Sequence, residues 1–288
     1  MIVGILGLGK MGRAIAERLE QEGQALVVWN RSPGKAEGLE AAVATSPAAL
    51  ARDCDVILSI LSDDAAIEQV YAGQDGLLST DLTGKTIVEM TTTAPGTTRA
   101  LEPKVQAKNG QMLECPVGGT IGPARDGQLL GLAGGTEAAF AVARTVLERI
   151  TRRLEHLGPM GSGAAMKLAI NLPLMIYWGA LGEALRLAGK GGIDTDQALS
   201  ILADSSGAIG AAKKRVGPIG AFLGGQPEST TAFEMSTAIK DMGLMQALGG
   251  GADVPLISAV LEQAKRAEAD GFGTRDASLL AAWVASHD

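Results

Sequence analysis

The chain has 288 residues, of which 39 are glycine, close to twice the usual share of about 7%. Apolar residues make up 46% of the sequence, which excludes intrinsic disorder, and the glycines follow no Gly-X-Y period, which excludes a collagen. The net charge of −7 argues against a broad nucleic-acid surface, because such a surface needs a basic face.

Short apolar runs of strand length alternate with helical stretches through the first half of the chain. Runs that are apolar throughout are typical of strands buried on both faces of a parallel sheet, and the alternation predicts right-handed βαβ units. The predicted strands are 2–6, 25–29, 56–61, 86–90, 111–114, 129–133 and 153–156, and the clearest predicted helices are 11–22, 95–109 and 136–150. The sequence therefore predicts an α/β fold with a Rossmann-type, doubly wound sheet.

The pattern changes at Gly161. From there the strand-like runs stop, and helical periodicity continues to the end of the sequence. A length of 288 residues also agrees with two domains of ordinary size. We predict a doubly wound domain over residues 1–160 and an all-helical domain over residues 161–288.

Cysteine use and the first residues indicate the compartment. Cys54 and Cys115 are the only cysteines and lack metal-ligand spacing, so we expect two small buried side chains in a reducing environment. Met1 leads directly into an apolar strand pattern, without the basic segment of a signal peptide. The most apolar stretch, residues 168–181, is interrupted by Asn171 and Pro173 and is too short to span a bilayer. We expect a soluble, cytoplasmic protein with no membrane or nucleic-acid partner.

A GxGxxG motif follows the first predicted strand and opens the first predicted helix. In this setting the first glycine allows a tight turn, the second lets a pyrophosphate approach the backbone, and the third lets helix and strand pack closely. A GxGxxG alone is weak evidence, but its position between a buried strand and an amphipathic helix predicts dinucleotide binding. The residues predicted to form this site are Gly7, Leu8, Gly9, Lys10, Met11 and Gly12.

The end of the second predicted strand indicates which dinucleotide binds. NAD enzymes usually place Asp or Glu there to bind the ribose 2′-hydroxyl. This chain has Asn30, Arg31 and Ser32 instead. A guanidinium can bind a 2′-phosphate in a bidentate manner and a serine hydroxyl can donate to it. We therefore expect NADP(H) rather than NAD(H); the alternative is an exposed loop arginine without a ligand.

A second group of candidate residues lies on the helix that enters the second domain. Lys167 and Asn171 are spaced i,i+4, so they share one helical face. Burying a lysine in so apolar a segment disfavours its charged form and lowers its pKa, which suits a general acid or base. The alternative is a lysine whose apolar stem is buried while its ammonium reaches solvent. Pro173 is expected to kink the helix just beyond the pair.

The other polar groups give weaker signals. His156, at a predicted strand end, and His287, the penultimate residue, are the only histidines, so a catalytic His–Asp pair is disfavoured. No histidine or acidic spacing indicates a metal site. Asp63-Asp64 is expected to cap a helix. The basic run 213–215 is expected on a solvated helical face, the alternative being contact with an anionic ligand.

Five segments of the sequence form an ordered set of motifs. They are GLGKMG at 7–12, EMTT at 89–92, ECPVGGT at 114–120, GSGAAMK at 161–167 with Asn171, and KD at 240–241. This set resembles the β-hydroxyacid dehydrogenase family, whose members include 3-hydroxyisobutyrate dehydrogenase and glyoxylate/succinic semialdehyde reductase. The family pattern is a GLGxMG turn, a strand ending in D-x-S-T, a DAPVSGG-like loop, a GxGxxxK helix with asparagine four residues after the lysine, and a late KD pair. The resemblance covers nearly the whole chain.

The resemblance implies roles for the residues at the matching positions. Lys167 is similar to the family's catalytic lysine, the general acid that protonates the carbonyl oxygen, and Asn171 to the asparagine that helps hold the substrate. The loop residues expected to bind the substrate's acid group, through backbone N–H groups and one hydroxyl, are Gly118, Gly119 and Thr120. The further residues expected to contact the cofactor are Leu61, Ser62, Thr92 and Lys240, with Asp241 orienting that lysine or bridging the domains.

Several positions depart from the family pattern. The usual serine of DAPVSGG is Gly118, and the second of its paired glycines is Thr120. A sulfolactaldehyde-reductase branch has a similar PVG-x-T loop but carries arginine where this chain has Gly119, so a sulfonate would lack that partner. Glu89 replaces the aspartate of D-x-S-T, and Ser62 replaces a proline. The identity of the substrate therefore does not follow from the family pattern.

These observations predict an NADP-dependent oxidoreductase that interconverts a small anionic hydroxyacid and its semialdehyde or oxo acid. The family resemblance also implies a homodimer or homotetramer, with the helical domain contributing to the substrate site and to assembly. Two alternatives stay open. An imine reductase is built on a related scaffold but usually lacks a lysine at the position of Lys167. A catalytically idle NADP-binding protein would have Lys167 or Asn171 replaced, and both residues are present.

Overall fold

The computed structural model describes residues 1–228, 231–250 and 254–287, and it divides into two compact units, Met1–Lys167 and Leu168–Asp288. The division falls within one long helix, α7 (Ser162–Lys190). The domain boundary predicted between residues 160 and 161 lies immediately before the first turn of this helix.

The first unit is built on a nine-stranded sheet with strand order β3-β2-β1-β4-β5-β6-β8-β7, and β9 pairs with β8. The first six strands are parallel, while β8 runs antiparallel to β6 and β7. This arrangement confirms the predicted Rossmann-type doubly wound sheet. The strands are β1 (Val3–Leu6), β2 (Leu26–Trp29), β3 (Ala42–Val43), β4 (Val56–Ser59), β5 (Thr86–Glu89), β6 (Gln111–Glu114), β7 (Val117–Gly118), β8 (Leu129–Gly135) and β9 (Thr151–His156).

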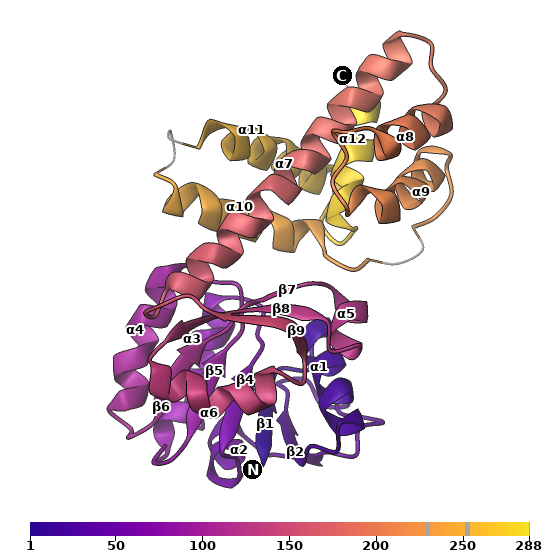
Figure 1. Ribbon diagram of the computed structural model, residues 1–288. Helices are drawn as coiled ribbons and strands as arrows, with labels where there is room; N and C mark the ends of the chain where they lie inside the picture. Colours follow the sequence, from indigo (N-terminus) through magenta and orange to yellow (C-terminus); the bar gives the residue numbers. More distant parts are fainter. Residues whose placement is uncertain (229–230, 251–253, 288) are drawn as a thin grey trace. The chain divides into compact units, whose positions relative to one another are not determined.

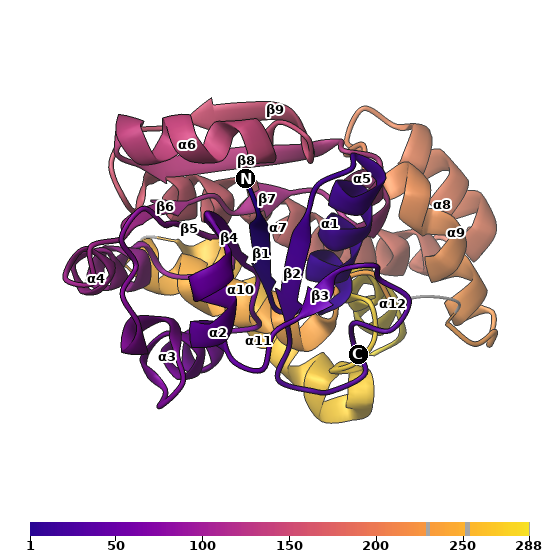
Figure 2. The same cartoon turned by 90° about the horizontal axis from the view of Figure 1, so that it is seen from below.

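Helices cover both faces of this sheet (Figures 1 and 2). The helices of this unit are α1 (Lys10–Gln21), α2 (Pro47–Asp53), α3 (Asp64–Ala72), α4 (Pro95–Gln106), α5 (Ile121–Arg125) and α6 (Glu137–Leu147), with a helical turn η1 (Leu77–Ser79). Alternate strand residues feed two separate cores, because successive side chains of a strand point to opposite faces. On β4, Val56 and Leu58 pack with α1 and α6, whereas Ile57 packs with α2, α3 and α4.

Local signals explain where several of these helices start and stop. Asp63 caps α3, its Oδ1 accepting from Ala66 N at 2.8 Å, which confirms the predicted cap. Thr136 caps α6 in the same way through Ala139 N at 3.2 Å. The helix expected over 95–109 ends at Gln106, because Asn109 adopts a left-handed conformation with φ of 65°. The strands expected over 56–61 and 86–90 likewise end earlier, at Ser59 and Glu89.

The second unit is helical in the residues that the structure describes, with one isolated β-bridge between Glu234 and Asp276. Its core gathers apolar side chains from every helix, including Leu168, Met175 and Trp178 on α7. The remaining elements are α8 (Thr195–Asp204), α9 (Ala212–Leu223), α10 (Met235–Leu248), α11 (Pro255–Ala267) and α12 (Leu280–Ser286), with the turns η3 (Glu268–Phe272) and η4 (Ala277–Leu279).

Helix α7 is longer than the apolar stretch recognised in the sequence. It spans 29 residues, continues through Pro173, and contains an 18-residue window of mean hydropathy 1.3. By length and composition alone this helix could therefore cross a bilayer, so the expectation that the segment is too short was wrong. The central helix of a globular helical domain passes the same test, and five α7 side chains belong to the core of the second unit.

Both cysteines are buried free thiols, as expected from the sequence. Burial raises the pKa of Cys54 and of Cys115 to about 12, so neither is a thiolate near neutral pH.

Candidate functional site

The predicted site residues of the first unit follow strands that end in one row. The parallel registers place the last residue of each of five strands side by side, in the order Trp29, Leu6, Ser59, Glu89 and Glu114. Loops that leave the carboxyl ends of neighbouring parallel strands meet at one edge of the sheet, where ligands of open α/β sheets bind. Gly7 and Asn30 directly follow β1 and β2, Leu61 and Thr92 lie in the loops after β4 and β5, and Gly118 lies in β7, which follows β6.

The three glycines of the GxGxxG turn are required for different reasons. Gly7 has φ of +95°, and a Cβ there would lie 2.1 Å from the backbone oxygen of Ile60. A Cβ on Gly12 would lie 2.0 Å from the backbone oxygen of Gly7. Gly9 is exposed, and a Cβ there would meet nothing within 4 Å. Protein packing thus explains Gly7 and Gly12, whereas the open space over Gly9 fits the approach of a pyrophosphate to the backbone.

The other residues of this turn are divided between core and surface. Leu8 has its side chain in the core, and its N–H donates to Asn30 Oδ1 at 2.9 Å. Met11 packs against the core, while Lys10 is exposed at the start of α1. The side chains of Leu8 and Met11 therefore support the turn, and Lys10 and the backbone at Gly9 are the parts exposed toward a ligand.

Asn30 ties the glycine turn to the loop after β2. Besides accepting from Leu8, its Nδ2 donates to the backbone oxygen of Ser32 at 3.0 Å. Arg31 and Ser32 are exposed, and Arg31 Nη1 contacts Gln69 Oε1 at 3.4 Å. The amide of Asn30, which was predicted to contact the cofactor, thus holds the glycine turn and the loop after β2 together. Arg31 and Ser32 are the accessible side chains of this loop.

Arg13 also shapes this loop and was missed from the sequence. Its Nη1 donates to the backbone oxygens of Lys35 and Glu37 at 3.0 and 2.8 Å, while its Nε pairs with Glu17 on the next turn of α1. The i,i+4 spacing of Arg13 and Glu17 was the available signal, but the loop contacts span more than 20 residues and leave no local pattern.

The loop after β4 is held by a chain of hydrogen bonds that starts at a buried carboxylate. Glu89 accepts from Tyr71 Oη at 2.9 Å and from Thr91 N at 2.8 Å, and Thr91 Oγ1 accepts from Leu61 N at 2.9 Å. Ser62, next in the loop, is exposed, and its hydroxyl donates to Asp63 at 2.9 Å. Thr92, the predicted cofactor contact, is half-buried, whereas Glu89 and Thr91, which fix the loop, were not singled out for this role.

The buried Glu89 gives a testable pH dependence. Burial raises its pKa above the ordinary value of 4.5, although hydrogen bonds from Thr91 and Tyr71 oppose the shift. The stability that this group contributes is therefore fully present below pH 4.5 and is lost as the pH rises through the raised folded-state pKa. The glutamine of Glu89→Gln cannot titrate. As the pH is raised above 4.5, the urea midpoint of unfolding should therefore fall less for Glu89→Gln than for wild type. Glu40→Gln, at an exposed position, is the control, and equal slopes for wild type and Glu89→Gln would contradict the argument.

The predicted substrate loop is accessible. Gly118 is half-buried in β7, and Gly119 and Thr120 are exposed. Gly119 has φ of +132°, and a Cβ there would lie 2.8 Å from a methyl of Leu129, so a larger residue would strain the loop. Thr120 is the N-cap residue of α5 but makes no side-chain cap bond to the described residues. Its hydroxyl is thus not committed to capping.

The GSGAAMK segment forms the start of α7. Gly161 has φ of +95°, and a Cβ there would lie 2.5 Å from the Arg99 guanidinium. A Cβ on Gly163 would lie 2.2 Å from the backbone oxygen of Leu132, so the helix approaches β8 backbone to backbone. Lys167 follows one turn later and is half-buried, not buried as its apolar surroundings in the sequence suggested.

In the second unit, two candidate residues, Asn171 and Lys240, contact the buried carboxylate of a third, Asp241. Asp241 is 2% exposed; its Oδ2 accepts from Asn171 Nδ2 at 3.4 Å, and its Oδ1 lies 3.2 Å from Lys240 Nζ. Asp241 therefore orients both the predicted substrate asparagine and the predicted cofactor lysine.

The remaining candidates from the sequence make structural contacts or lie exposed at the surface. His156 stacks on Phe140 and contacts the backbone oxygen of Gly135 at 2.9 Å. Arg215 forms an ion pair with the buried Asp276 at 3.4 Å, so it does not lie on a solvated face, whereas Lys213 does. Across residues 1–228, 231–250 and 254–287, no group of three His, Cys, Asp or Glu side chains is arranged to hold a metal ion.

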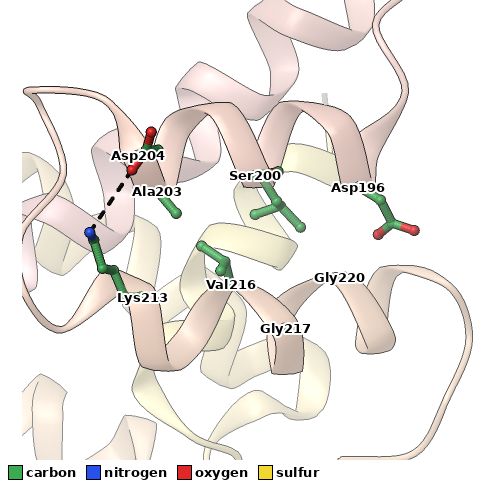
Figure 3. Close-up of a pocket in the computed structure, with 9 residues that line it drawn as sticks. Asp196, Ser200, Ala203, Asp204, Lys213, Val216, Gly217 and Gly220 are labelled. Atoms are coloured by element: carbon green, nitrogen blue, oxygen red, sulfur yellow. Dashed lines mark ion pairs between the residues drawn. The ribbon is translucent and has the colours of Figure 1, made fainter.

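A groove of about 350 Å³ lies between α8 and α9 in the second unit (Figure 3). Leu199, Ala203 and Val216 form its apolar part, and Lys213 pairs with Asp204 at 4.0 Å beside it. Of its lining residues only Lys213 was considered in the sequence, as part of the basic run 213–215.

Comparison with known families covers both units. Residues 2–162 match the model for the NAD binding domain of 6-phosphogluconate dehydrogenase. Residues 161–284 match the model described as NAD-binding of NADP-dependent 3-hydroxyisobutyrate dehydrogenase. Together the two matches account for nearly the whole chain.

Individual proteins agree with these matches. Glyoxylate/succinic semialdehyde reductase 1 of Arabidopsis thaliana is 34% identical over 285 residues, which cover 97% of each chain. A 3-hydroxyisobutyrate dehydrogenase structure from Salmonella typhimurium has a TM-score of 0.85 at 24% identity, covering 98% of this chain and 99% of that one. A reductive aminase from Aspergillus terreus has a TM-score of 0.64 at 23% identity, covering 96% and 97%. The two structures show a shared fold, and the family models with the Arabidopsis relative establish that the chain is an oxidoreductase of the β-hydroxyacid dehydrogenase family, with an NAD(P)-binding Rossmann-type domain followed by a helical domain.

Proposed function

We propose that the protein is an NADP-dependent reductase that interconverts a small anionic hydroxyacid and its semialdehyde or oxo acid. The observation that carries the proposal is the combination, in the first unit, of strand-end loops meeting at one sheet edge with Lys167 one turn into α7. The 34% identity to a glyoxylate/succinic semialdehyde reductase over 97% of both chains supports the same substrate class.

The preference for NADP(H) rests on the loop after β2. Arg31 and Ser32 are exposed there, and the three residues that follow Trp29 include no carboxylate to repel a 2′-phosphate. The open backbone at Gly9 fits the pyrophosphate of either dinucleotide, so the loop carries the discrimination.

Each chain group then has a defined task. NADPH, when bound, supplies the hydride. Gly118, Gly119 and Thr120 bind the acid group of the substrate, with the Gly119 N–H and the Thr120 hydroxyl as donors, since Gly118 is paired with Leu130 of β8. The Lys167 ammonium donates a proton to the carbonyl oxygen as negative charge develops there, and in the reverse direction the neutral amine takes it back. Asn171 helps hold the substrate and Lys240 the cofactor, both oriented by Asp241.

The loop composition narrows the substrate to a carboxylate of modest size. Gly119 stands where an arginine would be needed for a sulfonate, and the Thr120 hydroxyl replaces the family serine two positions earlier. A short acid of two to four carbons with a terminal aldehyde can accept hydrogen bonds from a few N–H donors and one hydroxyl.

A substrate panel tests this proposal. Glyoxylate, succinic semialdehyde, methylmalonate semialdehyde and tartronate semialdehyde are each incubated with NADPH, and absorbance at the NADPH band is followed. We expect at least one of these acids to be reduced with a kcat/KM of about 10⁴ M⁻¹s⁻¹ or higher, the lower end of ordinary enzymes. Turnover confined to cyclohexanone with an amine would instead favour the imine-reductase alternative, which the fold shared with the reductive aminase keeps in the panel. NADPH binding without any turnover would favour the idle binding protein.

The predicted homodimer or homotetramer and the predicted cytoplasmic location remain part of this proposal.

A further inference from the structure

A buried carboxylate joins three elements at the start of the helix that carries Lys167. Glu114, the last residue of β6, has 0% of its surface exposed. Its Oε1 accepts from Gly161 N at 2.8 Å and from Ala164 N at 3.1 Å, and its Oε2 accepts from Thr98 Oγ1 on α4 at 2.5 Å. All of these groups belong to the first unit.

Glu114 satisfies the amide groups that a helix leaves unbonded at its beginning. The first N–H groups of an α-helix have no partner within the helix, and a negative charge there is favourable. Ser162, the first residue of α7, does not serve as a cap, because its hydroxyl is buried without a hydrogen-bond partner among the described residues. The cap of α7 is therefore supplied by a strand residue, Glu114 of β6, which precedes Gly161 by 47 residues in the sequence.

The surrounding residues are shaped to admit this carboxylate. A Cβ on Gly134 would lie 2.6 Å from Glu114 Oε1, and a Cβ on Gly163 would lie 3.2 Å from it. Arg99, next to Thr98 on α4, donates from Nε to the backbone oxygen of Met160 at 3.0 Å, which fixes the segment just before the helix. Two adjacent α4 residues and the carboxylate thus hold the entry to α7.

The anchored turn is the one that sets the position of Lys167. Lys167 lies three residues after Ala164, within one helical turn of the last amide bound by Glu114. A general acid must lie within hydrogen-bond reach of its acceptor, and a displacement of about 1 Å costs on the order of 10²-fold in rate. A shift of the first turn of α7 would move Lys167 by a similar amount.

We propose that Glu114 is a positioning residue for Lys167, acting by holding the first turn of α7 through its carboxylate. The inference rests on the proposed function, because it takes Lys167 as the general acid. Glu114 itself touches neither substrate nor cofactor in this account.

The test compares kcat and KM for variants of this contact, with the best substrate of the panel and NADPH. Glu114→Ala should lower kcat by about 30-fold to 100-fold, as expected for a displaced acid, with the KM for NADPH within about twofold of wild type. Glu114→Gln retains an oxygen that can accept from both helix amides, so it should recover kcat to within about fivefold of wild type. Asp194→Ala is the matched control, because Asp194 also accepts from two amides at a helix start, Asp196 N and Gln197 N of α8, and should leave kcat unchanged.

Coupling to Lys167 separates positioning from a general loss of structure. If Glu114 acts through Lys167, the variant carrying both Glu114→Ala and Lys167→Ala should turn over at the rate of Lys167→Ala alone, within about twofold. A double variant slower by the full factor of Glu114→Ala would overturn the inference, as would a folded Glu114→Ala with wild-type kcat.

Should Glu114→Ala fail to fold, Thr98→Val decides the question. It keeps the side-chain shape and removes the hydroxyl that donates to Glu114 Oε2 at 2.5 Å and, more weakly, to the backbone oxygen of Pro95 at 3.3 Å within α4. It should lower kcat by about threefold to tenfold with an unchanged KM for NADPH. Unchanged kcat in Thr98→Val would then count against the inference. Full turnover in Lys167→Ala would remove the proposed function and this inference with it, whereas loss in Lys167→Ala with normal Glu114→Ala would remove only the inference.

Discussion

Lys167→Ala is expected to lower kcat about 10³-fold while NADPH still binds, because a positioned general acid contributes about 10² to 10⁴ in rate. Negative charge develops on the carbonyl oxygen of the substrate as the hydride is transferred. Without the Lys167 ammonium, this oxygen must take its proton from water. The substitution lies outside the glycine turn and the loop after β2, which carry predicted cofactor contacts. Fluorescence titration with NADPH should therefore give a Kd within about threefold of wild type, since the lysine makes no required cofactor contact.

Lys190→Ala is the matched control, because Lys190 is the exposed last residue of the same helix. The substitution removes a lysine from the opposite end of α7 to Lys167, so both kcat and the Kd for NADPH should stay at wild-type values. Undiminished turnover in Lys167→Ala would show that another group donates the proton. A parallel loss of NADPH binding would instead assign Lys167 to the cofactor site.

The parallel sheet was predictable because its strands carry their signal locally. Four of the strands, β1, β2, β4 and β5, lie in short apolar runs between helical stretches, which is typical of strands buried on both faces of a parallel sheet. The two-residue strands Ala42–Val43 and Val117–Gly118 were not predicted, since they are too short for any period to develop. Their pairing with β2 and β8 is decided by neighbours in space.

The tight glycine turn was predictable because a residue type meets a motif spacing, as the close backbone approach at Gly7 and Gly12 shows, whereas the catalytic role of Lys167 stays a prediction. The site was not predictable where a side chain acts on a distant part of the chain. In the sequence, Glu89 was noted only as a departure from the family aspartate, and Glu114 only as the first residue of the ECPVGGT segment. In the structure each ends a strand: Glu89 holds a neighbouring loop, and Glu114 holds the start of a helix. Nothing in the local sequence distinguishes a buried strand-end carboxylate with three donors from an exposed one, because the donors come from other elements.

The loop after β2 allows a prediction about cofactor choice. Arg31→Asp should reverse the preference from NADPH toward NADH, lowering the ratio of the two kcat/KM values by about 10²-fold to 10³-fold. A hydrogen bond to a charged group contributes about 1.5–3 kcal/mol, and each 1.4 kcal/mol corresponds to a factor of ten. Loss of the guanidinium therefore accounts for one to two powers of ten, and repulsion between the new carboxylate and the 2′-phosphate adds to it. The same carboxylate can accept a hydrogen bond from the 2′-hydroxyl of NADH, as at the strand end of NAD enzymes.

The effect should be specific to this position and to the 2′-substituent. Arg152→Asp, on β9, makes the same change of charge at another exposed arginine of the first unit and should leave the ratio unchanged. Because the attraction involves an exposed guanidinium, raising the salt concentration should weaken NADPH binding to wild type more than to Arg31→Asp. An unaltered ratio in Arg31→Asp would assign the discrimination to other groups near the ribose, of which Ser32 is the nearest in sequence. A ratio that changed equally in both variants would point to the net charge of the domain, since both substitutions alter that charge by the same amount.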